Sequence, residues 1–468
     1  MIQFQIDDKV IEANPGETVL QAALRNGIEI PHFCYHPCLS IAGNCRICMV
    51  KIKGRPGFHP SCNLAPAPGM EIENNCAEVD QVRKSILQFA TLNHPADCPI
   101  CDKAAECRLQ DYNFKYAGES SPSIEPKRRQ TKFYNVSERI ILDRERCILC
   151  SRCVRFTKEI SGSGMLGIVE RADHSRVERL EGKEIEDPYS DNLVQTCPVG
   201  ALLSRDFLYK SRVWYLDAVD SVCPRCSRGC SVKIWRRNKH WKVRALSQEK
   251  NQMAYRVSAR ENAEINGPWL CNKGFDLHHF INDAERALTP LVNGTPSSLD
   301  DAIAAAQTLL FESENQAAII SAWGSNEELE AFKSTLGSWI KVYTRQDRKP
   351  EEGEVVEDQF LIRSDKNPNS YAVQALFGVQ PFDPAAGHDV VLVWGDQVDY
   401  AAFGSAKVIH LATLAPEGER KADVLIPIST MFERSGHYTN CEGKVNRFEQ
   451  VFEKPESVQH AADVFGRL

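Results

Sequence analysis

The segment Cys147-Ile148-Leu149-Cys150-Ser151-Arg152-Cys153 places three thiols close together, and Cys197-Pro198 follows at a distance. Three thiolates so closely spaced wrap three corners of a [4Fe–4S] cube, and a distant cysteine before a proline supplies the fourth. Zinc rarely uses this spacing. A segment that served two clusters would carry a further cysteine at position 157, where Thr157 stands. We therefore expect one complete [4Fe–4S] cluster, held by Cys147, Cys150, Cys153 and Cys197.

The cysteine content favours metal sites over crosslinks. The chain has 18 cysteines among 468 residues, and most fall in tight groups. The first residues alternate between apolar and polar like a strand, so we expect no export signal and a cytoplasmic location, where grouped thiols are metal ligands or redox groups. No run approaches the ~18 apolar residues of a membrane-spanning helix. The net charge of −7, from 56 basic and 63 acidic residues, argues against nucleic-acid binding.

Residues 1–78 are expected to form a small β-rich module with one helix. Thr18 leads into an amphipathic stretch at 19–24, and Asn26-Gly27 supplies a stop. Loop sequence follows, with four cysteines in the spacing Cys34-x10-Cys45-x2-Cys48-x13-Cys62. The close pair with one distant cysteine fits a plant-type ferredoxin site, whereas the longer first gap departs from that pattern. Cys38 lies in this gap and is either an alternative to Cys34 as a ligand or a small buried hydrophobic residue.

A histidine joins three cysteines in the next group. His94-Pro95-Ala96-Asp97-Cys98-Pro99-Ile100-Cys101 is followed by Cys107. One imidazole and three thiolates form a common closed zinc set, and the same donors also suit an iron–sulfur cluster. The spacing alone leaves zinc and a cluster equally open. A histidine beside apolar sequence is also often a packed side chain.

A fourth group consists of Cys223, Cys226, Cys230 and the distant Cys271, which lies in the turn-like context Trp269-Leu270-Cys271. Four thiols supply four corners of a cube, although a zinc ribbon uses similar spacing. In total, 15 cysteines and His94 make four sets of four ligands. The cysteines left over are Cys38, Cys76 and Cys441.

The order of these sets resembles the large iron–sulfur subunit of bacterial respiratory NADH:quinone oxidoreductase, complex I. The resemblance covers about residues 1–275 and continues more loosely to the end. It is carried by Cys34-Tyr35-His36-Pro37, Asn44-Cys45-Arg46-Ile47-Cys48, the His94–Cys107 set, Cys147-Ile148-Leu149-Cys150-Ser151-Arg152-Cys153-Val154-Arg155-Phe156 and Trp269-Leu270-Cys271.

This resemblance implies the identity of each centre. It implies a [2Fe–2S] cluster on Cys34, Cys45, Cys48 and Cys62, a [4Fe–4S] cluster on His94, Cys98, Cys101 and Cys107, and another on the 147–197 set. Only some members of the family keep a cluster at the fourth set, and this sequence has all four of its thiols. The implied partners are a flavin- and NADH-binding subunit, a small [2Fe–2S] subunit, and ferredoxin-like and quinone-site subunits. Together they form a peripheral arm at the cytoplasmic face of the inner membrane.

Residues 276–468 are expected to form an α/β domain. The apolar runs Ala317–Gly324 and Val390–Gly395 end in glycine, as buried parallel strands do, and a helical stretch at 301–311 precedes the first. The segments 422–427 and 440–445 resemble parts of the molybdopterin oxidoreductase domain that the large iron–sulfur subunit carries without the cofactor. Because about 190 residues are too few for the full pterin-binding architecture, we expect no molybdenum.

The expected fold is therefore a series of α+β cluster modules followed by a shortened α/β domain that resembles molybdopterin oxidoreductases. The modules are a β-grasp [2Fe–2S] ferredoxin domain, a His/Cys [4Fe–4S] module, a bacterial-ferredoxin-like module and a four-cysteine module. The domain boundaries that we predict are 1–78, 79–135, 136–215, 216–275 and 276–468.

No catalytic residue stands out from the sequence. Gly162-x-Gly164-x-x-Gly167 matches the dinucleotide fingerprint in letters, but it follows the cysteine triplet rather than a strand, so we interpret it as a glycine-rich loop. Hydride chemistry is therefore expected on a partner, and this chain is expected to relay single electrons towards quinone as one subunit of the oxidoreductase. The alternatives are a diaphorase-type subunit of an NAD-linked hydrogenase and a formate dehydrogenase, which needs a complete pterin domain.

Overall fold

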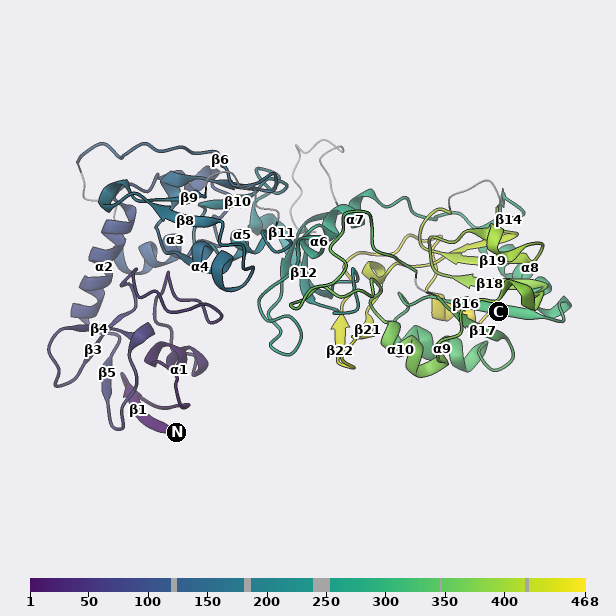
Figure 1. The fold of residues 1–468 in the computed structure, drawn as a ribbon, viewed down its shortest axis with the longest axis horizontal. Helices are drawn as coiled ribbons and strands as arrows, with labels where there is room; N and C mark the ends of the chain where they lie inside the picture. The colour runs from purple at the N-terminus through teal and green to yellow at the C-terminus, as the bar shows by residue number, and fades with distance from the viewer. Residues whose placement is uncertain (119–123, 181–186, 239–252, 346, 417–420) are drawn as a thin grey trace. The chain divides into compact units, whose positions relative to one another are not determined.

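The structure is a computed structural model that describes residues 1–468 except 119–123, 181–186, 239–252, 346 and 417–420. The chain divides into two compact units, Met1–Tyr215 and Leu216–Leu468, and each is described by itself (Figure 1). Among the described residues, no helix combines the length and the apolar character that crossing a membrane requires.

The first unit begins with a five-stranded sheet in the order β2-β1-β5-β3-β4. Its strands are β1 (Ile2–Ile6), β2 (Lys9–Ala13), β3 (Met49–Ile52), β4 (Phe58–Pro60) and β5 (Glu71–Glu73). Helix α1 (Val19–Arg25) is capped by Thr18, whose side chain accepts a hydrogen bond from Gln21 N. The Gln21 side chain accepts a hydrogen bond from Thr18 N in return. The helix ends at Asn26, so the predicted helix and its stop are confirmed. Val19, Leu20, Ala22 and Ala23 of α1 pack into the core of this sheet.

The rest of the first unit consists of short elements that hold long loops. Helix α2 (Ala77–Thr91) leads from the five-stranded sheet to this part (Figure 1). A three-stranded sheet has the order β10-β7-β6, and β8 pairs with β9 in a separate hairpin. These strands are β6 (Tyr134–Asn135), β7 (Ile140–Leu142), β8 (Leu166–Val169), β9 (Arg176–Arg179) and β10 (Leu202–Ser204). The helices are α3 (Arg108–Tyr112), α4 (Arg152–Glu159) and α5 (Asn192–Thr196).

The second unit opens with a three-stranded antiparallel sheet in the order β11-β12-β13. Its strands are β11 (Leu216–Val222), β12 (Ser231–Arg237) and β13 (Ala254–Ala259), and two short helices follow, α6 (Asn272–Phe275) and α7 (Leu277–Asp283). A hairpin of β21 (Gly436–Thr439) and β22 (Val445–Phe448) returns from the far end of the chain. Glu449 N, just after β22, donates to Asp220 O of β11 at 3.0 Å, so this hairpin packs beside the three-stranded sheet.

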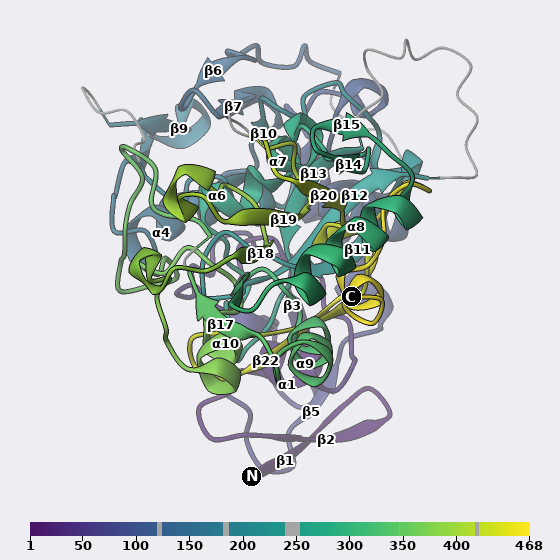
Figure 2. The same cartoon turned by 90° about the vertical axis from the view of Figure 1, so that its right-hand side faces the viewer.

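A seven-stranded sheet forms the centre of the second unit, in the order β15-β14-β20-β19-β18-β16-β17. The strands are β14 (Leu291–Val292), β15 (Thr295–Pro296), β16 (Gln316–Ile320), β17 (Lys341–Thr344), β18 (Val390–Trp394), β19 (Lys407–Ala412) and β20 (Val424–Pro427). Strands β16 to β20 pair in parallel, and β18 and β19 lie side by side in the middle (Figure 2). The predicted buried parallel strands are thus confirmed at β16 and β18.

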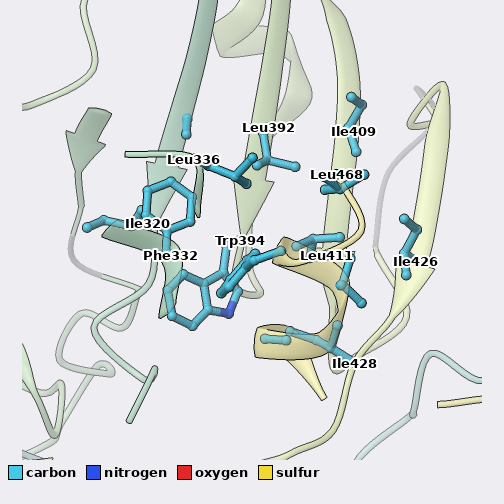
Figure 3. Close-up of a cluster of buried hydrophobic side chains, with 14 of the residues drawn as sticks. Ile320, Phe332, Leu336, Leu392, Trp394, Ile409, Leu411, Ile426, Ile428 and Leu468 are labelled. Carbon is cyan, nitrogen blue, oxygen red and sulfur yellow. The ribbon is translucent and has the colours of Figure 1, made fainter. Parts of the chain in front are cut away.

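Both faces of this sheet are covered. The helices of this region are α8 (Leu299–Glu312), α9 (Asn326–Thr335), α10 (Ser370–Phe377) and α11 (Ala461–Phe465). On one face, Phe332 lies 6.1 Å from the Trp394 ring and 5.2 Å from the Phe465 ring, and Leu392 and Ile409 join this core (Figure 3). Side chains of the alternate strand positions form a second core on the other face. Because both faces are buried, all five residues of β18 are apolar.

Candidate iron–sulfur centres

The first ligand set is assembled by the loop that follows α1. Cys34, Cys48 and Cys62 are buried, and Cys45 is half-buried. Cys34 N donates to Cys45 Sγ at 3.4 Å, and the thiols of Cys45 and Cys62 hydrogen-bond Cys34, which lowers its pKa to about 2. Cys62 in turn hydrogen-bonds Cys48 and lowers its pKa to about 7. The pKa values of Cys45 and Cys62 are raised in turn, because hydrogen bonds to Cys34 and, for Cys62, to Cys48 hold the proton on these two thiols. The four sulfur atoms therefore lie together, and iron would bind them in the thiolate form.

Cys38 differs from the four predicted ligands in its exposure. It is exposed, and its backbone N–H donates to His36 Nδ1 at 3.2 Å. Cys34, by contrast, contacts Cys45 and Cys62 directly. The geometry favours Cys34 over Cys38 as the first ligand.

The second set has the donor chemistry of a metal site. Burial lowers the pKa of His94 to about 4, so its imidazole is neutral at pH 7, and its buried Nδ1 has no hydrogen-bond partner. Neutral imidazole is the form that ligates metals. Cys107 feels the charges of Cys101 and Cys98, and burial raises its pKa to about 11. His94 lines a cavity with Cys147, Ile148 and Leu149 of the third set. A buried imidazole nitrogen without a partner and three thiols that act on one another are donors that suit a metal centre.

The four thiols of the third set line one cavity. Cys147, Cys150, Cys153 and Cys197 share this cavity with apolar side chains that include Leu142, Val199 and Leu202. Burial raises the pKa of Cys147 to about 12 and that of Cys150 to about 11. Thiols in such a place do not ionise by themselves, whereas metal coordination deprotonates them outright.

The fourth set lies in the second unit. Cys223 N donates to Cys230 O at 2.8 Å, which closes the loop that carries Cys226. Burial raises the pKa of Cys230, and the charges of Cys226, Cys223 and Cys271 raise it further, so the four thiols are neighbours. Cys441, one of the three spare cysteines, is exposed.

The spacing of the donor atoms bears on the choice between zinc and a cluster. Zinc holds thiolates at about 2.3 Å, so tetrahedral geometry brings sulfur atoms to about 3.8 Å from one another. Within the part of the chain that the structure describes, no three donor atoms of these sets lie within 4.8 Å of one another. A cluster of several iron and sulfide atoms holds its ligands farther apart than a single ion does. A single zinc ion would need three or four of these donors closer together than they lie here.

Left-handed backbone inside the chelating loops turns amide groups towards sulfur. Arg46 (φ 61°), Ala105 (φ 67°), Leu149 (φ 53°) and Ser151 (φ 60°) lie between ligands, as does Gly229 (φ 60°) in the fourth set. Leu149 N, for example, donates to Cys147 Sγ at 3.4 Å. Four of these five residues are not glycine, so this conformation is strained and is maintained by the surrounding structure. Such residues tighten the loops around their centres.

The glycine-rich motif has a different setting from the one that dinucleotides require. Gly162 and Gly164 follow helix α4, and Gly167 lies in β8, which pairs with β9 in an antiparallel hairpin. The dinucleotide fingerprint instead joins a strand to a helix in a parallel unit.

A cavity in the second unit is not predicted by the sequence. It measures about 270 Å³ and lies at the carboxyl ends of β16, β18 and β19, where Ser321, Asp396 and Thr413 line it with Trp323 and Phe280. In open parallel sheets, ligands bind at this edge where the strand order reverses, here between β16 and β18. These residues are far apart in the sequence, so only the folded sheet brings them together.

Four regions of the chain match known protein families, in the same order as the four ligand sets. Residues 1–76 match the 2Fe-2S iron-sulfur cluster binding domain, and residues 83–121 match the NADH-ubiquinone oxidoreductase-G iron-sulfur binding region. Residues 137–203 match the ferredoxin-like domain of NADH-quinone oxidoreductase subunit 3, and residues 216–283 match the molybdopterin oxidoreductase Fe4S4 domain. The chain thus contains one [2Fe–2S] domain and several [4Fe–4S] domains, as predicted.

Curated relatives resemble the chain over its N-terminal part and beyond. The G-type subunit of the NADH-quinone oxidoreductase of Streptomyces coelicolor is 34% identical over 305 residues, which are 64% of this chain and 34% of the relative. The second G-type subunit of Rhizobium meliloti is 36% identical over 348 residues, which are 73% of this chain and 39% of the relative. The chain therefore spans less than two fifths of the length of these relatives. Among solved structures, a chain of an NAD+-reducing [NiFe]-hydrogenase in the H2-reduced state matches with 30% identity and a TM-score of 0.41, over 45% of this chain and 91% of that chain.

The four matched regions follow the order of the ligand sets. This order and the sequence identity with these relatives are consistent with the resemblance seen in the sequence. Over residues 1–283, the chain is similar to the large, G-type iron–sulfur subunit of NADH-quinone oxidoreductases.

Proposed function

We propose that this chain is an electron-relay subunit of an NADH:quinone oxidoreductase, which passes electrons from a flavoprotein partner towards quinone. One observation carries the proposal: the 15 cysteines and His94 fall into four groups of four donors along the sequence, and each group lies within a matched iron–sulfur region. Iron–sulfur clusters exchange single electrons. A row of such sites suits conduction, and hydride chemistry on the nicotinamide is assigned to the partner.

The proposed ligands are those that the sequence predicts. They are Cys34, Cys45, Cys48 and Cys62 for a [2Fe–2S] cluster, and for [4Fe–4S] clusters His94, Cys98, Cys101 and Cys107; Cys147, Cys150, Cys153 and Cys197; and Cys223, Cys226, Cys230 and Cys271. Domain boundaries at 78, 135, 215 and 275 belong to the same proposal. The gathered thiols, the orphaned His94 Nδ1 and the donor spacing support it.

Contacts within the first unit support an order of electron flow. Asn44 Nδ2, beside Cys45, donates to Leu149 O of the third set at 3.1 Å. Arg108 N, which follows Cys107 of the second set, donates to Pro198 O, which follows Cys197 of the third, at 3.1 Å. The third set is therefore a neighbour of both the first and the second. Arg108 also bonds His32 Nε2, two residues before Cys34, at 2.6 Å, so the first and second sets are neighbours as well. We propose a path from the [2Fe–2S] centre through the 147–197 centre to the His94 centre, with the fourth set off the path.

The proposed partners are a flavin- and NADH-binding subunit, a small [2Fe–2S] subunit, and ferredoxin-like and quinone-site subunits of one complex. The names of the curated relatives support such an assembly. The chain would work in a peripheral arm at the cytoplasmic face of the inner membrane, which it touches only through the complex. We propose no nucleic-acid partner.

Metal analysis and reduction assays test the function. Anaerobically purified protein should contain iron and acid-labile sulfide in amounts near one two-iron and three four-iron clusters. Dithionite should reduce it, whereas NADH should do so only after a flavin-bearing partner is added. Zinc with little iron would refute the proposal, and rapid reduction of the isolated chain by NADH would refute the division of labour. Reduction only in the presence of a hydrogenase partner would favour the diaphorase alternative.

A further inference from the structure

Two arginines of helix α4 are buried, and their bonds within the described residues go to backbone carbonyl groups and to Ser151 rather than to a carboxylate. Arg152 is 4% exposed and Arg155 is 8% exposed. Arg146, another buried arginine of the first unit, bonds Asp97 at 2.7 Å and Asp143 at 3.2 Å. Within the described residues, neither Arg152 nor Arg155 forms such an ion pair. Glu159, at the end of the same helix, accepts from Ser40 N at 2.8 Å, and the charge of Arg155 acts on its carboxylate without a direct bond. A buried cation is costly unless an anion compensates it.

The guanidinium groups bridge the loops of the first and third ligand sets. Arg155 Nη2 donates to Cys34 O at 2.5 Å and to Cys150 O at 3.4 Å, and Arg155 Nη1 donates to Ser40 O. Each bond of Nη2 thus reaches the backbone of a proposed ligand, one from each set. The planar guanidinium group, with five donors in fixed directions, is suited to such a bridge.

Arg152 repeats this arrangement one turn earlier on the same helix. Its Nη2 donates to Tyr35 O, next to Cys34, at 2.5 Å, and its Nη1 donates to Thr196 O, next to Cys197, at 3.3 Å. A guanidinium group stays protonated in proteins, so Arg152 is a cation at pH 7. Arg152 also lines the cavity that Cys147, Cys150, Cys153 and Cys197 share.

We propose that Arg152 and Arg155 are a shared counter-charge for the [2Fe–2S] and 147–197 centres and set the reduction potentials of both. This inference rests on the proposed function, because it needs both centres to be loaded. A thiolate-ligated cluster is anionic and gains a further negative charge on reduction. A cation fixed in low-dielectric surroundings stabilises the reduced state more than the oxidised state and thereby raises the potential. One arginine that reaches both loops acts on both centres at once.

Neutral variants of the full chain test this proposal. Arg155→Gln and Arg152→Gln should each lower the midpoint potentials of both centres, measured by EPR-monitored redox titration of the anaerobic protein. Arg155→Lys keeps the charge and should recover most of the shift. Lys158→Gln removes a cation from an exposed position of the same helix and should change neither potential. Unchanged potentials in both glutamine variants, or a change in one centre only, would overturn the proposal.

A second pair of variants keeps the test decisive if the glutamine variants do not retain their clusters. Ser151 Oγ accepts from Arg155 Nε at 3.3 Å, and Ser151 has left-handed backbone (φ 60°) that aspartate and asparagine tolerate. Ser151→Asp places a carboxylate against the guanidinium, whereas Ser151→Asn is its neutral match. The aspartate variant should lower the potential of the [2Fe–2S] centre relative to the asparagine variant, and equal potentials would overturn the proposal. Absence of iron–sulfur signals from the wild-type protein would instead refute the proposed function.

Discussion

Replacing Gly200 with alanine probes how closely the second and third ligand sets are packed. Gly200 follows Cys197-Pro198-Val199 of the third set, and its backbone faces Cys101 of the second. A Cβ added at Gly200 would lie 2.2 Å from Cys101 Sγ and 3.2 Å from Lys103 Cβ. The φ angle of Gly200 is outside the left-handed region, so alanine meets no backbone strain there. The effect of the substitution therefore comes from the close approach of the new Cβ to Cys101 and Lys103.

The size of the clash predicts which centre is lost. Non-bonded heavy atoms pack at about 3.5–4.0 Å, so Cys101 Sγ or the Gly200 loop must move by more than about 1 Å. Metal–ligand distances are held to about ±0.2 Å, and the required movement exceeds that tolerance several times. We expect Gly200→Ala to lose or strongly distort the centre on His94, with about four fewer irons per chain when it is lost. Relaxation of the overpacked loop should cost about 1–3 kcal/mol of stability.

Iron and sulfide analysis with low-temperature EPR of the dithionite-reduced protein measures this outcome. Gly167→Ala is the matched control, because its added Cβ would meet only Leu180 Cδ2 at 3.6 Å, which is ordinary contact, and should leave every centre in place. Full iron content and an unchanged signal from the His94 centre in Gly200→Ala would refute the packing argument.

Three further predictions concern the ligands and the second unit. His94→Cys should keep a cluster with a lower midpoint potential, because thiolate adds negative charge where imidazole is neutral, and an unchanged EPR signal and potential would contradict ligation by His94. Cys45→Ser and Cys48→Ser should block reduction by NADH through the flavin-bearing partner, while dithionite still reduces the other centres. Cys226→Ser, in the fourth set, should lower thermal stability more than turnover. A larger loss of turnover than of stability would contradict a fourth set off the path. Phe332→Ala should destabilise the second unit by about 3–5 kcal/mol in thermal unfolding, with iron content as the control, and a loss below about 1 kcal/mol would contradict its core position.

Local patterns allowed the sequence to predict the elements that such patterns determine. The Thr18 cap and the Asn26 stop delimit α1 because capping is decided within a few residues. The run at β18 is apolar throughout because both faces of the sheet are buried, and this composition is visible without any partner strand. Ligand spacing within a loop is local in the same sense. This is why the four sets could be proposed from the sequence.

Features that depend on tertiary packing were not accessible in this way. Arg46, Ala105 and Leu149 adopt left-handed backbone although none is glycine, and propensity alone argues against this conformation. The chelating loops impose it on them. Arg152 and Arg155 stand among the residues that carry the family resemblance, yet nothing near them in the sequence distinguishes a buried bridge from an exposed basic helix. Their contacts with Cys34 and Tyr35 span more than 110 positions.

Two contacts join the third ligand set to the two earlier sets. The loop that carries Cys197 returns from far along the chain to pack Gly200 against Cys101, while helix α4 presents Arg155 to Cys34. The third set therefore touches both earlier sets. Electron transfer needs close approach between centres, and these two contacts are formed by a glycine without a side chain and by an arginine that bridges two loops. We therefore expect substitutions at Gly200 and Arg155 to perturb centres to which they contribute no ligand.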